Sequence, residues 1–178
     1  MAPEGAGFLY VSHRRAAAIV PRTAGWLSHQ DGMGFLFEGA GNLSYERPFK
    51  QTAEVFEGGM TNGLGFAALE ASLDPLLSLG VEEIFQHVSG YLDELEAELC
   101  ALGLHSLRSG DASGRSGILS FREDPQSAAK IDLLKLQARL TEAGVICTAP
   151  DGCLRFAPHW PNPRAEVAEV VRAVRQLL

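Results

Sequence analysis

The sequence contains no run of about 18 consecutive apolar residues, which is the length that a membrane-spanning helix requires. Its first residues, MAPEGAG, also lack the positively charged segment followed by an apolar segment that marks a secretory signal peptide. These two absences argue against a membrane span and against secretion. We therefore expect a soluble, cytoplasmic protein with no membrane partner.

Basic residues and cysteines are both scarce. The chain has 15 Lys and Arg against 22 Asp and Glu, a net charge of −7, whereas a nucleic-acid-binding surface needs a basic stripe. We therefore expect no nucleic-acid partner. The three cysteines, Cys100, Cys147 and Cys153, are odd in number and lack the spacing of a metal site. They are interpreted as reduced, buried structural thiols, with no metal and no disulfide framework.

The stretch over residues 55–80 organises the chain. Gly58 and Gly59 suit a backbone that turns sharply or approaches a ligand closely, because glycine reaches positive φ without steric cost. Apolar residues at three- and four-residue steps then predict a helix covered on two sides. Asp74 and Pro75 predict a break, with Asp74 capping a second short helix. The alternative is an ordinary helix start after a glycine turn.

The region before that helix is predicted to hold one strand and loops. Residues 8–11, FLYV, form a continuous apolar run typical of a strand buried on both faces, whose partner strands lie elsewhere. Residues 16–20 could form another short strand. The glycine-rich stretch that follows is predicted to be an ordered loop, in which Trp26 either walls a pocket or anchors the loop by packing.

The C-terminal half predicts a layered α+β unit. Strands are expected at residues 104–109, 117–123, 145–148 and 153–157, the last two joined by a type I turn over residues 149–152. Helices are expected from residue 81 to Gly103, with a solvated acidic face and a surface histidine at His87, from Ser127 to Gly144, and after Asn162 and Pro163. The predicted fold is thus an antiparallel sheet of about four strands, covered by helices on one face.

Arg155 is the most informative single residue of that half. It alternates with Leu154 and Phe156 in the last predicted strand, so it points away from the core on the same side as Cys153 and Ala157. An arginine amid apolar residues is unfavourable unless its fork meets an anion. Arg155 is therefore either a reader of a carboxylate or phosphate, or one half of a surface ion pair across the sheet.

Five short motifs occur in a shared order along the chain. They are APEGAGFLYVS at residues 2–12, the Gly25 and Trp26 pair, AEVFE at residues 53–57 with Gly59 and Asn62, RSGI at residues 115–118, and LRFAPH at residues 154–159 with Asn162. In this order they resemble the class V aminotransferase family of pyridoxal-phosphate enzymes. That group has fold type I and includes cysteine desulfurases and isopenicillin-epimerase-like proteins.

The resemblance implies a homodimeric enzyme acting on an amino-acid substrate through pyridoxal 5'-phosphate. It implies that Arg155 binds the substrate carboxylate, and that Gly59, Thr61 and Asn62 lie on the cofactor-phosphate side. The family's threonine at this position is replaced here by Met60, which cannot donate a hydrogen bond, and Thr61 is its neighbour. The family's arginine in the preceding motif is replaced by Val55.

The resemblance also implies a lysine that forms a Schiff base with the cofactor, shortly before the first motif. The only lysines here are Lys50, Lys130 and Lys135, and none matches that position. We therefore expect a C-terminal portion of such an enzyme that is inactive and does not bind the cofactor alone. Residues 1–53 would be a remnant of the large domain, 54–80 an interdomain turn and helix, and 81–178 the small domain.

Two alternatives remain open at this stage. The chain could be a non-catalytic dimerisation or binding module that keeps the small-domain fold. A cysteine desulfurase or selenocysteine lyase is the less favoured subtype, because it needs a thiolate on a mobile loop and the connection from Gly144 to Arg155 is too short to hold a long one.

Overall fold

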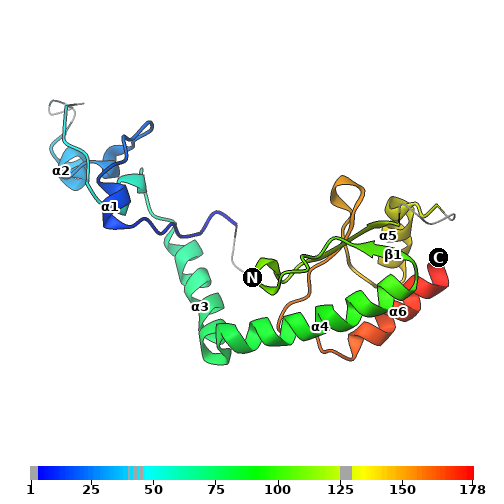
Figure 1. Ribbon diagram of the computed structural model, residues 1–178. Coiled ribbons are helices and arrows are strands. Elements are labelled where there is room, and N and C mark those ends of the chain that lie inside the picture. Colours follow the sequence, from blue (N-terminus) through cyan, green and yellow to red (C-terminus); the bar gives the residue numbers. More distant parts are fainter. Residues whose placement is uncertain (1–3, 40, 42–43, 45, 125–129) are drawn as a thin grey trace. The chain divides into compact units, whose positions relative to one another are not determined.

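A computed structural model describes residues 4–39, 41, 44, 46–124 and 130–178 (Figure 1). The chain divides into two compact units, Met1–Pro75 and Leu76–Leu178, and each is considered by itself. The three-part division expected from the sequence, at residues 53 and 80, stays a prediction.

The first unit is built from short helices and loops. Its elements are α1 (His13–Ala16), η1 (Trp26–Ser28), α2 (Gly32–Phe37), η3 (Ala53–Phe56) and most of α3 (Gly63–Leu79), which ends in the second unit. Asp31 caps α2 by accepting a hydrogen bond from the Gly34 amide, and Asn62 Oδ1 accepts one from the Gly65 amide at the start of α3.

The strand predicted over residues 8–11 is not present. This segment is extended but pairs with no strand of the described chain, and the side chains of Phe8 and Tyr10 are 79% and 86% exposed. Residues 16–20 are not a strand either, because the Ala16 and Ala17 amides bond locally to Ser12 and His13 as in a helix. An apolar run such as residues 8–11 forms a buried strand only where neighbouring strands are present to pair with it.

The segment that holds Gly58 and Gly59 lies against the backbone at Gly25. A Cβ on Gly25 would lie 1.6 Å from the Gly58 carbonyl oxygen, so no larger residue fits there. A Cβ on Gly59 would lie 3.7 Å from Trp26 Nε1, which places the indole against this turn. Trp26 thus packs on the loop, as the anchor interpretation predicts.

The break predicted at Asp74 and Pro75 is wrong. Helix α3 continues through Pro75, and the chain breaks five residues later at Gly80, whose φ is +87°. Glycine adopts this backbone angle without steric cost, so the helix ends there, whereas at Pro75 the helix loses one amide donor and continues. The two-sided cover is also wrong within this chain, because Gly65 and Leu69 are the buried residues of α3, whereas Leu64 is 89% exposed.

The second unit holds the sheet. Strands β1 (Leu104–Ser106), β2 (Leu119–Glu123) and β3 (Leu154–Phe156) form an antiparallel sheet in the order β1-β2-β3. The sheet has three strands, not about four. The strand predicted over residues 145–148 contributes only an isolated bridge between Thr148 and Arg155.

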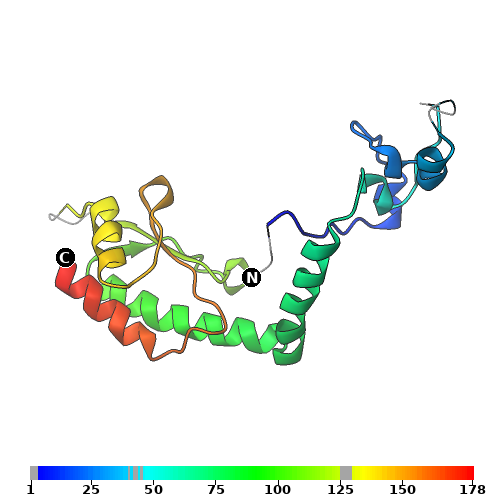
Figure 2. The ribbon, with the colours of Figure 1, turned by 180° about the vertical axis from the view of Figure 1, so that it is seen from behind.

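Three helices cover one face of this sheet. They are α4 (Val81–Ala101), α5 (Leu133–Glu142) and α6 (Glu166–Leu177), and Figure 2 shows α4 and α6 running side by side beneath the strands. The most deeply buried side chains come from both layers and include Leu92, Leu95, Leu99, Leu119, Phe121, Leu140, Leu154, Val167 and Val174. The predicted α+β layer, with helices on one face, is confirmed.

Three predicted boundaries move. Helix α5 begins after Asp132, whose carboxylate accepts from the Lys135 amide, while Ser127 lies outside the described residues. Helix α6 begins at Glu166, and Asn162 instead accepts a hydrogen bond from the His159 amide. Positive φ angles at Asp151 and Gly152, with the Cys153 amide bonded to Pro150, make the hairpin turn type I′ one residue later than predicted.

In the described residues no single helix is long and apolar enough to cross a membrane. Helices α3 and α4 pass that test of length and composition only when they are taken together across the break at Gly80.

Candidate functional site

The face of the sheet opposite the helices carries polar side chains. Leu119, Phe121, Leu154 and Phe156 fill the core face, so the residues between them point the other way. Ser120 lies directly opposite Arg155 in the register of β2 and β3. This face, which also carries Arg122 and Cys153, is called the open face below.

Arg155 is half-buried and is held by a single neighbour. Its Nε donates to Thr148 Oγ1 at 3.0 Å, and its backbone exchanges hydrogen bonds of 2.7 and 3.2 Å with Thr148. None of the described carboxylates lies within ion-pair distance of its guanidinium. The alternative of an ion pair across the sheet is therefore not found in the described chain, and both terminal Nη atoms stay available to a ligand.

The open face also holds a pair that the sequence analysis missed. Arg122 Nε lies 3.4 Å from Cys153 Sγ, and this hydrogen bond raises the pKa of Arg122. Two guanidinium groups thus lie on one face of a protein with net negative charge. The alternation of Leu119, Ser120, Phe121 and Arg122 could have revealed this, since it places Arg122 on the same face as Arg155.

The three cysteines differ in accessibility. All are free; Cys147 and Cys153 are buried as predicted, but Cys100 is exposed. Burial raises the pKa of Cys147 to about 11, so its thiol is protonated and weakly nucleophilic at neutral pH. Among the described residues there is no group of histidines, cysteines and carboxylates that could hold a metal ion.

Gly59, Thr61 and Asn62 lie together in the loop that leads into α3, in the first unit. Asn62 is already engaged, because its Oδ1 caps α3 and its Nδ2 lies 3.5 Å from the Gly5 carbonyl oxygen. Thr61 is exposed, and its side chain forms no hydrogen bond with the described residues. Of this predicted phosphate set, Thr61 alone presents an uncommitted side-chain donor. Arg155 belongs to the second unit.

Each of the three lysines is ion-paired. Lys50 lies 3.4 Å from Glu54, Lys130 3.3 Å from Glu123, and Lys135 3.1 Å from Asp132. A lysine that is engaged in an ion pair is not free to attack the carbonyl carbon of a cofactor. None of them has the environment of such a lysine.

The RSGI motif serves the scaffold. Arg115 donates to the Ser109 carbonyl and lies 3.5 Å from Asp93. The neighbouring Arg108 is more deeply placed, with 3% of its side chain exposed and ion pairs to Asp93 and Glu96. The carboxylates expected to be merely solvated on α4 therefore fix the connection between β1 and β2.

The LRFAPH motif is also tied to α4. His87, expected to be a surface residue, is half-buried, and its Nε2 lies 2.8 Å from the Asn162 carbonyl oxygen. This bond joins α4 to the segment between β3 and α6.

Comparison with curated proteins gives relatives that are named as enzymes. No family model matches the chain. It is 26% identical to an uncharacterized aminotransferase, YcbU, of Bacillus subtilis over 167 residues, which is 94% of this chain and 40% of that protein. It is 28% identical to a probable cysteine desulfurase of Methanothermobacter thermautotrophicus over 183 residues, covering 94% of this chain and 42% of that protein. The chain thus spans about two fifths of the length of these curated relatives.

The solved structures agree on the fold. The cysteine desulfurase CsdA of Escherichia coli matches with a TM-score of 0.77 at 20% identity, over 99% of this chain and 43% of that one. The apo cysteine desulfurase of Thermococcus onnurineus matches with a TM-score of 0.65 at 16% identity, over 76% and 36% of the two chains. The described chain therefore has the α+β fold of the matching part of these cysteine desulfurase structures, and its curated relatives are named as an uncharacterized aminotransferase and a probable cysteine desulfurase.

Proposed function

We propose that this chain is the C-terminal part of a pyridoxal-phosphate-dependent, class V aminotransferase-like enzyme, in which Arg155 binds the carboxylate of an amino-acid substrate. The observation that carries the proposal is the guanidinium of Arg155, which has no carboxylate partner among the described residues. Similarity to two proteins with enzyme names over 94% of the chain supports it and does not favour a non-catalytic binding module.

The surroundings of Arg155 suit carboxylate recognition. Thr148 fixes Nε, which orients the planar fork and leaves Nη1 and Nη2 to donate two parallel hydrogen bonds. The Ser120 hydroxyl lies opposite on the same face and could add a third donor. The Arg122 guanidinium raises the positive potential of this face, which attracts an anion.

The cofactor would supply an electron sink for chemistry at the substrate α-carbon. The residues of this chain do not fit it by themselves, because Lys50, Lys130 and Lys135 each lie in an ion pair with a carboxylate and none matches the position of the family's Schiff-base lysine. Asn62 is committed to capping α3, which leaves Thr61 as the side-chain donor for a phosphate. We propose that this chain alone neither forms the Schiff base nor turns over substrate.

A cysteine desulfurase subtype is less well supported by the thiols. Such chemistry needs a thiolate nucleophile, and Cys147 is buried with a pKa raised to about 11. Cys153 is also buried, and the exposed Cys100 lies in helix α4 and not on a loop. An aminotransferase-like reaction needs neither thiol.

The active protein is further proposed to be a homodimer. Apolar side chains of the first unit that are largely exposed support this, namely Phe8, Leu9, Tyr10, Met60 and Leu64. Exposed apolar groups in this number favour association with another protein surface. Sedimentation velocity of the chain over a range of concentrations tests the proposal, and a strictly monomeric species at high concentration would contradict it.

The carboxylate-binding role of Arg155 is tested by titrating the full chain with L-alanine while following the amide resonances of Ser120 and Thr148. A weak saturable shift is expected, and Arg155→Gln should weaken it about tenfold or more, because a charge-assisted pair contributes about 1.5–3 kcal/mol. Arg172→Gln, an exposed residue of α6, removes the same charge elsewhere and serves as the control. Equal affinity of the Arg155→Gln and Arg172→Gln variants for L-alanine would show that Arg155 does not bind the carboxylate.

The absence of a Schiff base is tested separately. The chain is incubated with pyridoxal 5'-phosphate, reduced with borohydride, and digested for mass spectrometry. Scattered low labelling is expected across Lys50, Lys130 and Lys135. One lysine labelled to completion, with the others unlabelled, would show that this chain holds the cofactor after all.

A further inference from the structure

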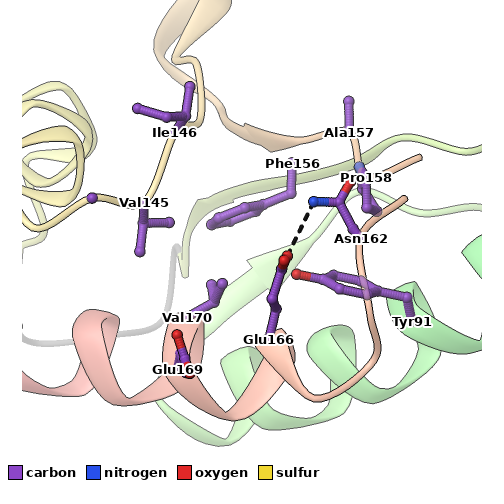
Figure 3. Close-up of a pocket in the computed structure, with 11 residues that line it drawn as sticks. Tyr91, Val145, Ile146, Phe156, Ala157, Pro158, Asn162, Glu166, Glu169 and Val170 are labelled. Atoms are coloured by element: carbon purple, nitrogen blue, oxygen red, sulfur yellow. Dashed lines mark hydrogen bonds between the residues drawn. The ribbon is translucent and has the colours of Figure 1, made fainter. Parts of the chain in front are cut away.

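A pocket of the second unit lies on the helix side of the sheet, and its lining includes none of Ser120, Arg122, Cys153 and Arg155. Its volume is about 490 Å³, which is within the range of small-molecule sites. It is lined by Tyr91 of α4, by the segments that follow α5 and β3, and by the first turn of α6 (Figure 3).

Tyr91 is the most unusual member of this lining. The residue is 5% exposed, yet none of the described residues forms a hydrogen bond with its hydroxyl group. Figure 3 shows the hydroxyl directed towards the carboxylate of Glu166, and burial together with the charge of Glu166 raises the pKa of Tyr91. The Tyr91 hydroxyl therefore offers an uncommitted hydrogen-bond donor and acceptor to a ligand in the pocket.

Glu166 is held in position by a chain of hydrogen bonds. Asn162 Nδ2 donates to Glu166 Oε2 at 3.0 Å, while Asn162 Oδ1 accepts from the His159 amide at 2.9 Å. His87 Nε2 lies 2.8 Å from the carbonyl oxygen of the same asparagine. The second carboxylate oxygen, Oε1, has no partner among the described residues, so it is fixed and open towards the pocket.

The charge of the pocket is of one sign. Glu169 contributes a second carboxylate, and no Lys, Arg or His is among the residues that line the cavity. Neither Glu166 nor Glu169 forms an ion pair with a described residue. The remaining walls are mainly apolar and include Val145, Ile146, Phe156 and Val170.

We propose that this pocket binds a small organic ammonium ion with a short apolar stem. The ammonium group would donate to Glu166 Oε1 and to the hydroxyl oxygen of Tyr91, and Glu169 would add long-range attraction. The stem would lie against Val145, Phe156 and Val170. This site is distinct from the carboxylate site proposed at Arg155, and it requires no cofactor.

The test uses the full chain and 1-butylammonium chloride, followed through the backbone amides of Gly144, Val145 and Ala157. A saturable shift in the millimolar range is expected. Glu166→Gln keeps the hydrogen bond from Asn162 but removes the charge, and should weaken binding about tenfold. Tyr91→Phe keeps the ring and should weaken binding about threefold. Glu98→Gln removes one charge from an exposed pair with Arg175 and should leave the affinity unchanged.

Comparison ligands keep the test decisive even if a pocket variant unfolds. Sodium butyrate and 1-butanol have stems like that of 1-butylammonium but lack the positive charge, so neither should produce a saturable shift in the unmodified chain. The proposal is overturned if either binds as well as the ammonium ion, if 1-butylammonium gives no saturable shift, or if a folded Glu166→Gln variant binds as tightly as the Glu98→Gln control. These outcomes are independent of whether Arg155 binds L-alanine.

Discussion

Arg108 Nη1 lies 2.6 Å from Asp93 Oδ1, joining the loop after β1 to the middle of α4. The arginine side chain is nearly inaccessible to solvent, and its second partner is Glu96 at 2.9 Å. The positive charge is thus removed from water and compensated by two carboxylates of one helix.

Replacing Glu96 by Gln should therefore destabilise the second unit. The change leaves a poorly solvated guanidinium with one carboxylate that is half exposed, and we expect a loss of about 2 kcal/mol in the free energy of unfolding. Urea denaturation followed by circular dichroism measures this. The control Glu98→Gln breaks an exposed pair of 3.8 Å with Arg175 and should change stability by less than about 0.5 kcal/mol. Equal effects of the two variants would refute the structural role of Arg108.

The contact between Gly25 and Gly58 predicts that Gly25→Ala disrupts the first unit. The new Cβ would collide with the Gly58 carbonyl oxygen, so one of the two backbones must move. Faster amide exchange and faster proteolysis are expected within residues 1–75, with the second unit unchanged. Gly7→Ala introduces the same methyl group where no atom lies within 4 Å and should behave like the unmodified chain.

The hairpin turn that precedes Arg155 depends on Gly152. Its φ of +72° disfavours a side chain, and we expect Gly152→Ala to destabilise the unit by about 1 kcal/mol. Asp151→Asn should be tolerated, because asparagine adopts positive φ as readily as aspartate does. Thermal unfolding of the two variants distinguishes them, and a larger loss for Asp151→Asn would contradict the assigned turn type.

The buried thiol of Cys147 predicts a dependence of stability on alkaline pH. Because the folded pKa is raised to about 11 from an unfolded value near 9, the unfolded state loses its proton first as pH rises. Stability should be intact below about pH 9 and fall by about 2 kcal/mol between pH 9 and 11. Cys147→Ala lowers stability at all pH values but should show a smaller decline over this interval. If Cys147→Ala lost as much stability between pH 9 and 11 as the unmodified chain, the decline would arise from other titrating groups.

Periodicity predicted most of the second unit. The alternation of apolar and polar residues in β3 gave the correct faces, and the spacing in α4 gave its buried side, because both patterns are properties of one element and the core it meets. The turn type was missed because it depends on the backbone angles of two residues, and both a type I and a type I′ turn accommodate the PDG sequence.

The first unit was predicted less well, for a related reason. An apolar run such as residues 8–11 indicates burial only when partner strands are present, and Pro75 indicates a break only when the helix has no other support. At the candidate site, Arg155 was found from its conflict with an apolar strand. The alternation in β2 predicts that Arg122 lies on the same face as Arg155, but its contact with Cys153 is set by the strand register, which the sequence does not reveal.

The extended segment at residues 8–10 also determines how this chain should behave when it is handled. Phe8, Leu9 and Tyr10 present three large apolar groups to water, on a backbone that pairs with no strand in the described part of the chain. Such segments favour aggregation through the pairing of strands from different molecules. Concentrated stocks should become turbid on ageing. Placing a lysine at position 9 should keep them clear.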